Sequence, residues 1–139
     1  MANIDLLKPK IKKMAMELIN ACNAVGIKII ITQTLRTIAE QDALYAQGRT
    51  KPGKIVTNAK GGTSFHNFGV ALDFCPVIDG KAVWNDHSLF EKVGSIGAGL
   101  GFEWGGNWKD FKDRPHLQFT AGYSLKEFMD NKIDWSKFN

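Results

Sequence analysis

Two short stretches of this 139-residue chain place a histidine near a carboxylate, a pairing that can bind a metal ion. His66 stands seven residues before Asp73, and Asp113 stands three residues before His116. A catalytic zinc site takes three protein ligands from histidine and carboxylate groups and leaves one position for water. The pattern therefore predicts that His66, Asp73 and His116 are the ligands of a zinc ion.

The seven-residue step between the first two ligands restricts the local structure. On one straight strand, an odd step points two side chains to opposite faces. His66 and Asp73 can converge only if His66 lies on the approaching loop and Gly69 turns the chain before the strand that carries Asp73. The small Ala71 leaves room beside such a site.

Asp113 is predicted to move protons rather than to bind the metal. Pro115 disfavours a helix here, so Asp113 belongs to the loop just before the strand of His116. A carboxylate there can accept a proton from the attacking water and pass it to the leaving amine. Glu103 is the rival for this role. The plain alternative for either motif is a structural histidine with a solvent-exposed aspartate.

Other reactive or aromatic side chains have simpler interpretations. Cys22 and Cys75 are too far apart for a CxxC pair and too few for a disulfide scaffold. Cys75 is interpreted as a core thiol, the alternatives being a nucleophile or a soft zinc ligand. His87 is interpreted as structural. Trp104 and Trp108 either line a substrate groove or pack in the core.

Hydrophobic periodicity predicts the elements that hold these residues. The expected helices are 6–25, 37–47, 86–99 and 124–131, and the expected strands are 27–32 (buried), 69–77, 82–84, 102–104 and 116–119. The Gly- and Lys-rich segment 48–62 is expected to be a long loop, a type that is often functional. This order predicts an α+β domain with a small, mainly antiparallel sheet flanked by helices.

Length and composition fit one compact domain over residues 1–139. Apolar residues make up 44% of the chain, and 18 Lys and Arg against 14 Asp and Glu give a net charge of +4. This charge suits an anionic partner such as a cell-wall polymer but does not require one. No apolar run approaches a membrane span and the N-terminus lacks a signal-peptide pattern, so we expect no membrane insertion.

The motif Ser64-x-His66-x-x-Gly69-x-Ala71-x-Asp73, followed by Asp113-x-x-His116, resembles the zinc peptidases that cut peptidoglycan stem peptides. These are the D-alanyl-D-alanine carboxypeptidases and the L-alanyl-D-glutamate endopeptidases, including those of phage endolysins. Segments 34–50, 64–74 and 101–108 are most similar to the endopeptidase branch. The proton-shuttling position is Glu in many relatives and Asp here.

The resemblance implies roles for three further residues. Arg36 matches an arginine beside the metal that stabilises the developing oxyanion, and its alternative is a surface salt bridge. Gln41 and Ser64 match positions that contact the substrate. Their alternatives are an exposed helix glutamine and a loop-capping serine.

The resemblance thus implies a zinc-dependent L-alanyl-D-glutamate endopeptidase acting on peptidoglycan stem peptides. Alternatives are a D-alanyl-D-alanine carboxypeptidase of the same fold, a cysteine peptidase using Cys75, and a basic binding module built on Lys51, Lys54 and Lys60. We expect no nucleic-acid partner, a monomer, and no separate wall-binding domain. We also expect storage in the host bacterial cytoplasm until release to the wall, as for a phage endolysin.

Overall fold

The centre of the molecule is a five-stranded antiparallel sheet, seen in a computed structural model that describes residues 2–139. Its main strand order is β1-β2-β5-β4, and β3 pairs with the end of β2. The strands are β1 (Lys28–Gln33), β2 (Ala71–Ile78), β3 (Lys81–Ala82), β4 (Glu103–Trp104) and β5 (His116–Gln118). The predicted α+β class with a small antiparallel sheet is confirmed.

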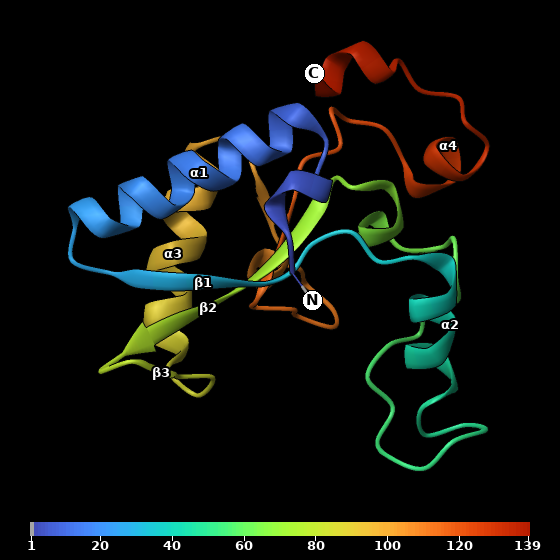
Figure 1. Ribbon diagram of the computed structural model, residues 1–139, viewed down its shortest axis with the longest axis horizontal. Helices are drawn as coiled ribbons and strands as arrows, with labels where there is room; N and C mark the ends of the chain where they lie inside the picture. Colours follow the sequence, from blue (N-terminus) through green and yellow to red (C-terminus); the bar gives the residue numbers. More distant parts are fainter. Residues whose placement is uncertain (1) are drawn as a thin grey trace.

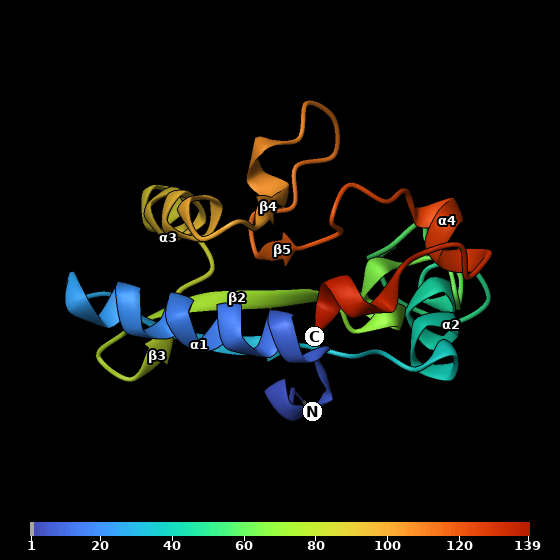
Figure 2. The ribbon, with the colours of Figure 1, turned by 90° about the horizontal axis from the view of Figure 1, so that it is seen from above.

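Two helices pack along the sheet and two lie beyond one of its ends (Figures 1 and 2). α1 (Pro9–Ala24) runs alongside β1 and also packs on α3 (His87–Gly99), and α3 packs on β4. Beyond the end of the sheet lie α2 (Ile38–Ala46) and α4 (Leu125–Met129). The described part of the chain also holds four 3₁₀ turns: η1 (Ile4–Leu6), η2 (Phe65–Phe68), η3 (Gly105–Asn107) and η4 (Trp135–Phe138).

The amphipathic pattern of α1 works as expected, although the helix is shorter than predicted. Ile11, Leu18 and Cys22 are fully buried, and a completely buried Leu or Ile contributes about 1.5–3 kcal/mol. The helix begins at Pro9 rather than at residue 6, because proline fits only the first turn, where its missing N–H leaves no bond unmade. Gly26 follows the helix in the left-handed region with φ +78°, a conformation in which glycine commonly ends helices.

The segment 27–32 forms a strand as predicted, but the prediction that this strand is buried is wrong. β1 runs along an edge of the sheet, and only Ile29 of its isoleucines is buried, while Ile30 is 42% exposed. An all-apolar β-branched run looks the same in sequence whether one or both of its faces are covered. The buried strand is instead β2, whose residues from Ala71 to Pro76 are buried apart from Asp73.

The segment between α2 and η2 is a long loop, as predicted, with one isolated bridge between Gln47 and Lys51. The helix before it is held by a capping box: the Thr37 side chain accepts from the Glu40 N–H, and the Glu40 carboxylate accepts from the Thr37 N–H. Within residues 2–139, no helix is both long and apolar enough to span a membrane.

Candidate metal centre

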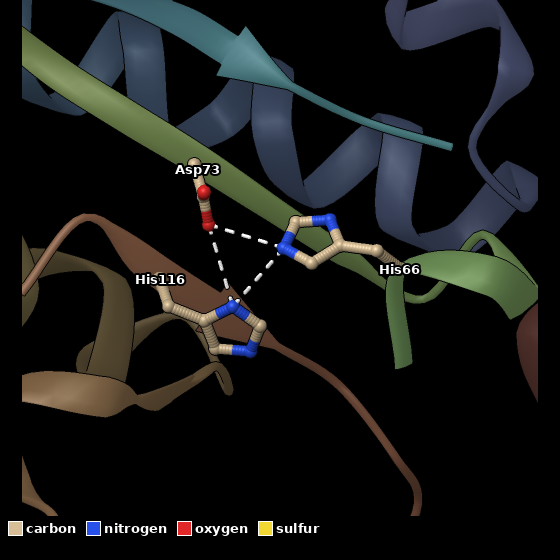
Figure 3. A group of neighbouring side chains, drawn as sticks. All are labelled: His66, Asp73 and His116. Carbon is tan, nitrogen blue, oxygen red and sulfur yellow. Dashed lines mark hydrogen bonds and ion pairs between the residues drawn. The ribbon is translucent and has the colours of Figure 1, made fainter. Parts of the chain in front are cut away.

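His66, Asp73 and His116 converge on one point, as the sequence predicted (Figure 3). His66 Nε2 lies 3.2 Å from Asp73 Oδ1 and 3.2 Å from His116 Nδ1. His116 Nδ1 lies 3.3 Å from Asp73 Oδ1, which closes a nearly regular triangle. Both histidines are buried, and the Asp73 side chain is 17% exposed.

Local chain geometry produces this convergence. His66 lies on η2, and Gly69 ends that turn in the left-handed region with φ +73° before β2 starts at Ala71. In the antiparallel register of β2 and β5, Asp73 lies directly opposite His116, so their side chains share one face at close range. The turn at Gly69 thus allows the side chains of His66 and Asp73 to converge although seven residues separate them in sequence.

The spacing of the three atoms fits a tetrahedral metal ion. Ligands bonded at about 2.0–2.1 Å to a tetrahedral centre lie about 3.3–3.4 Å from one another. The observed 3.2–3.3 Å spacing needs almost no adjustment. His66 Nδ1 lies 3.0 Å from the Thr34 carbonyl oxygen, which only accepts, so Nδ1 carries a proton, and in the neutral, metal-binding form of His66 the Nε2 lone pair faces the centre.

The electrostatics of the cluster favour a charged Asp73. Burial opposes ionisation, but the hydrogen bonds from His116 and His66 outweigh it and hold the pKa of Asp73 well below its usual range. Burial also opposes a charged His116. The hydrogen bond to Asp73 and its negative charge outweigh that effect and raise the pKa of His116.

Asp113 lines a cavity of about 230 Å³ together with His66 and His116. Its Oδ2 is 4.0 Å from His116 Nδ1, and its side chain is 45% exposed. Partial burial, and then the negative charge of Asp73, raise the pKa of Asp113. Gly105 holds the loop in place, because its carbonyl accepts from the Asp113 N–H and a Cβ at Gly105 would collide with the Asp113 carbonyl.

Arg36 reaches the same cavity from the segment between β1 and α2. Its Nη2 lies 3.7 Å from Asp73 Oδ2, its Nη1 donates to Gln41 Oε1 at 3.1 Å, and its Nε donates to Gln33 Oε1 at 3.3 Å. Gln41 is fully buried, and its Nε2 donates to the Ala59 carbonyl at 2.9 Å. The alternative of an exposed Gln41 is therefore wrong, and this side chain holds Arg36 to the long loop.

Ser64 caps η2 and also borders the cavity. Its Oγ accepts from the His66 N–H at 3.2 Å, so the loop-capping alternative is correct, and its substrate contact stays a prediction. Trp108 lines the cavity, with its ring centroid 5.3 Å from that of His116. Trp104 is 7% exposed and packs in the core.

The remaining candidates fall outside the metal centre. Glu103 hydrogen-bonds to Gln118 and Thr120 and is not among the cavity-lining residues, which favours Asp113 as the proton carrier. Cys75 is fully buried and donates to the Pro76 carbonyl, and burial raises its pKa, so it is a core thiol as predicted. His87 is the exposed first residue of α3.

Sequence reasoning missed the residues that support the ligands from behind. Thr34 is 1% exposed and Gln118 5% exposed, and both contact a ligand histidine on the side away from the metal centre. Gln118 stands two residues after His116, the spacing that places two strand residues on one face. This two-residue spacing could have indicated from the sequence that Gln118 lies beside His116.

Comparisons with known proteins agree with this site. Residues 57–119 match a peptidase M15 family model described as D-alanyl-D-alanine carboxypeptidase. The chain is 47% identical over 121 residues to the peptidoglycan L-alanyl-D-glutamate endopeptidase CwlK of Bacillus subtilis (strain 168), covering 81% of this chain and 72% of CwlK. The chain belongs to the peptidase M15 family. The resemblance seen in the sequence motifs is confirmed.

Two further matches extend the comparison. The chain is 34% identical over 132 residues to the L-alanyl-D-glutamate peptidase of Listeria phage A118, covering 92% of this chain and 43% of the phage protein. The crystal structure of a mutant vancomycin-resistance D,D-pentapeptidase VanY in complex with Zn(II) matches with a TM-score of 0.63 at 15% identity, covering 95% and 83% of the two chains. That second likeness concerns the fold.

Proposed function

We propose that this protein is a zinc-dependent endopeptidase that hydrolyses the L-alanyl–D-glutamate bond of peptidoglycan stem peptides. The carrying observation is the triangle of His66, Asp73 and His116, open to a cavity beside Asp113, in a chain 47% identical to CwlK. Two nitrogen ligands and one oxygen ligand form a donor set typical of catalytic zinc. When bound, zinc supplies Lewis acidity, which polarises the scissile carbonyl and makes water a better nucleophile at neutral pH.

Asp113 is the proposed general base and acid. It lines the cavity, and its Oδ2 lies 4.0 Å from His116 Nδ1, farther than the 3.2–3.3 Å that separates the three ligand atoms from one another. A carboxylate in this place can accept a proton from the attacking water and then donate it to the departing amine of D-glutamate. Its partly buried position and the nearby negative charge of Asp73 favour holding that proton during the step.

Arg36 is the proposed oxyanion-stabilising group. Its guanidinium is held by two glutamine side chains, so its remaining N–H groups keep a fixed direction as charge develops on the carbonyl oxygen. A fixed cation of this kind needs no reorganisation during the reaction. We assign Gln41 to positioning Arg36, and Ser64 to contacting the substrate at the cavity wall.

The family model favours a second candidate function, a D-alanyl-D-alanine carboxypeptidase. The same metal centre serves both reactions, because each hydrolyses an amide bond. Incubation with a pentapeptide-containing muropeptide separates them: the endopeptidase leaves free D-alanine at background, whereas the carboxypeptidase releases one D-alanine per peptide. The predicted monomeric state and storage in a host cytoplasm stay predictions.

Metal removal on purified cell walls tests the proposal. We expect chelation to abolish the loss of turbidity and added zinc to restore it. Cys75→Ala should clear the suspension at the rate of the unchanged protein, because Cys75 is buried away from the cavity. Full lysis by thoroughly metal-free protein would refute the zinc mechanism, and loss of lysis in Cys75→Ala with its fold intact would favour a cysteine peptidase.

A further inference from the structure

A chain of hydrogen bonds runs from His116 away from the metal centre to an exposed glutamate. His116 Nε2 lies 2.8 Å from Gln118 Oε1, and Gln118 Nε2 donates to Glu103 Oε2 at 3.0 Å. Thr120 Oγ1 donates to Glu103 Oε1 at 3.0 Å. The antiparallel register makes Glu103 and Gln118 direct partners on β4 and β5, so the relay is built into the sheet.

The donors and acceptors in this series of hydrogen bonds can be arranged in only one way. An ionised carboxylate only accepts hydrogen bonds, so the Gln118 side chain must turn its NH₂ group toward Glu103. Its carbonyl oxygen then faces His116 Nε2 and requires a donor there. When His116 is neutral it therefore carries its one proton on Nε2, and the lone pair on Nδ1 faces His66 and Asp73.

We propose that Glu103 is a positioning residue for the metal centre: through Gln118 it holds His116 in the tautomer whose Nδ1 can bind the ion. This inference rests on the proposed zinc site. His66 needs no such relay, because the main-chain carbonyl of Thr34 fixes its tautomer directly. Outer partners of ligand histidines commonly account for a 10- to 100-fold change in metal affinity, so about that much is expected of Glu103.

Removing the charge of Glu103 should release this constraint. The amide introduced by Glu103→Gln can donate as well as accept, so Gln118 is free to turn over and offer its NH₂ to His116. The His116 tautomer that matches this arrangement has its proton on Nδ1, directed at the position of the metal. Zinc binding must then first reverse the amide and the tautomer.

The first test measures zinc affinity by competition with a chromophoric chelator. For Glu103→Gln, we expect the zinc Kd to rise about 10- to 100-fold and the visible spectrum of the cobalt(II) form to change. Glu91→Gln, a control at an exposed position on α3, should leave both within error of the unchanged protein. An unchanged Kd and spectrum in Glu103→Gln would overturn the inference.

A reciprocal exchange separates polarity from general damage. In Glu103→Gln combined with Gln118→Glu, the introduced amide donates to the introduced carboxylate, whose other oxygen accepts from His116 Nε2–H. We expect this double variant to bind zinc more tightly than Glu103→Gln alone, with a coupling between the two sites in a double-mutant cycle. Strictly additive effects would contradict the relay.

Parallel assays distinguish failure of this inference from failure of the proposed function. If the unchanged protein neither binds zinc nor lyses walls, both are wrong. If it binds zinc and lyses walls while Glu103→Gln binds zinc equally well, only the relay is wrong. The unfolding temperatures of the metal-free variants should match that of the unchanged protein within a few degrees. Weaker zinc binding in a variant that is no longer folded would count against the relay.

Discussion

Gln41→Met should separate a positioning role for Gln41 from a substrate contact. The variant keeps the side-chain volume but removes the bond from Arg36 and leaves the Ala59 carbonyl without its buried donor. A hydrogen bond to a charged group contributes about 1.5–3 kcal/mol, and an unsatisfied acceptor costs about 1–3 kcal/mol when buried, so the half-buried Ala59 carbonyl falls at the low end of that range. Because the two losses overlap in one network, we expect a destabilisation of about 2–4 kcal/mol.

Thermal unfolding and kinetics measure this prediction. An unfolding entropy of about 2.1 cal/mol/K per residue gives this chain about 290 cal/mol/K, so each kcal/mol lowers Tm by roughly 3–4 °C. The expected drop in Tm is therefore about 7–14 °C. With Arg36 loosened, kcat should fall about 10- to 100-fold while KM changes little, because the lost interaction acts in the transition state.

Gln47→Met is the matched control, since Gln47 caps the same helix and donates to the Lys54 carbonyl at an exposed site. Its stability should change by at most about 0.5 kcal/mol, with normal kcat. A Gln41→Met variant with a higher KM and an unchanged kcat would refute the positioning role and restore Gln41 as a substrate contact.

Three further predictions concern the proton carrier, a helix cap and core packing. Asp113→Asn should retain one zinc per chain by elemental analysis but lose about 10²- to 10⁴-fold in kcat, and unimpaired turnover would rule out Asp113 as the base. The backbone hydrogen bond from Thr37 lowers the pKa of Glu40, so its charge stabilises the fold above pH 4.5 and that contribution is lost as pH falls below it. Glu40→Gln should thus have a lower Tm at pH 7, with a gap that narrows under acid; a gap independent of pH would disprove the linkage. Gly94→Ala would push a Cβ into the Trp104 ring, so calorimetry should show a loss of about 1–3 kcal/mol, and a neutral result would mean that the ring can move aside.

The metal ligands could be predicted because short sequence motifs contain both the ligand residues and the residues that determine the local backbone geometry. The step from His66 to Asp73 requires a turn, and Gly69 supplies it, as predicted, by adopting the left-handed conformation. Helix ends can also be read from residue types, since the Asp86 side chain caps α3 and Gly26 follows α1 in the left-handed region.

The parts that escaped prediction depend on long-range contacts. The exposure of β1 follows from its edge position in the sheet, which no local pattern encodes. The burial of Gln41 follows from the path of the long loop, whose Ala59 carbonyl accepts its amide hydrogen. Glu103 accepts a hydrogen bond from Gln118 because the register of β4 and β5 places the two residues opposite each other. The sequence does not reveal this register, so from sequence alone Glu103 remained an alternative to Asp113 as the proton carrier.

The most direct measurement of the central claim is the mass spectrum of a defined muropeptide after digestion by the zinc-loaded protein. The account predicts a disaccharide that carries a single L-alanine, together with the released peptide beginning at D-glutamate, and neither product after chelation. A spectrum that shows only the loss of D-alanine, or the same cut by metal-free protein, would contradict it.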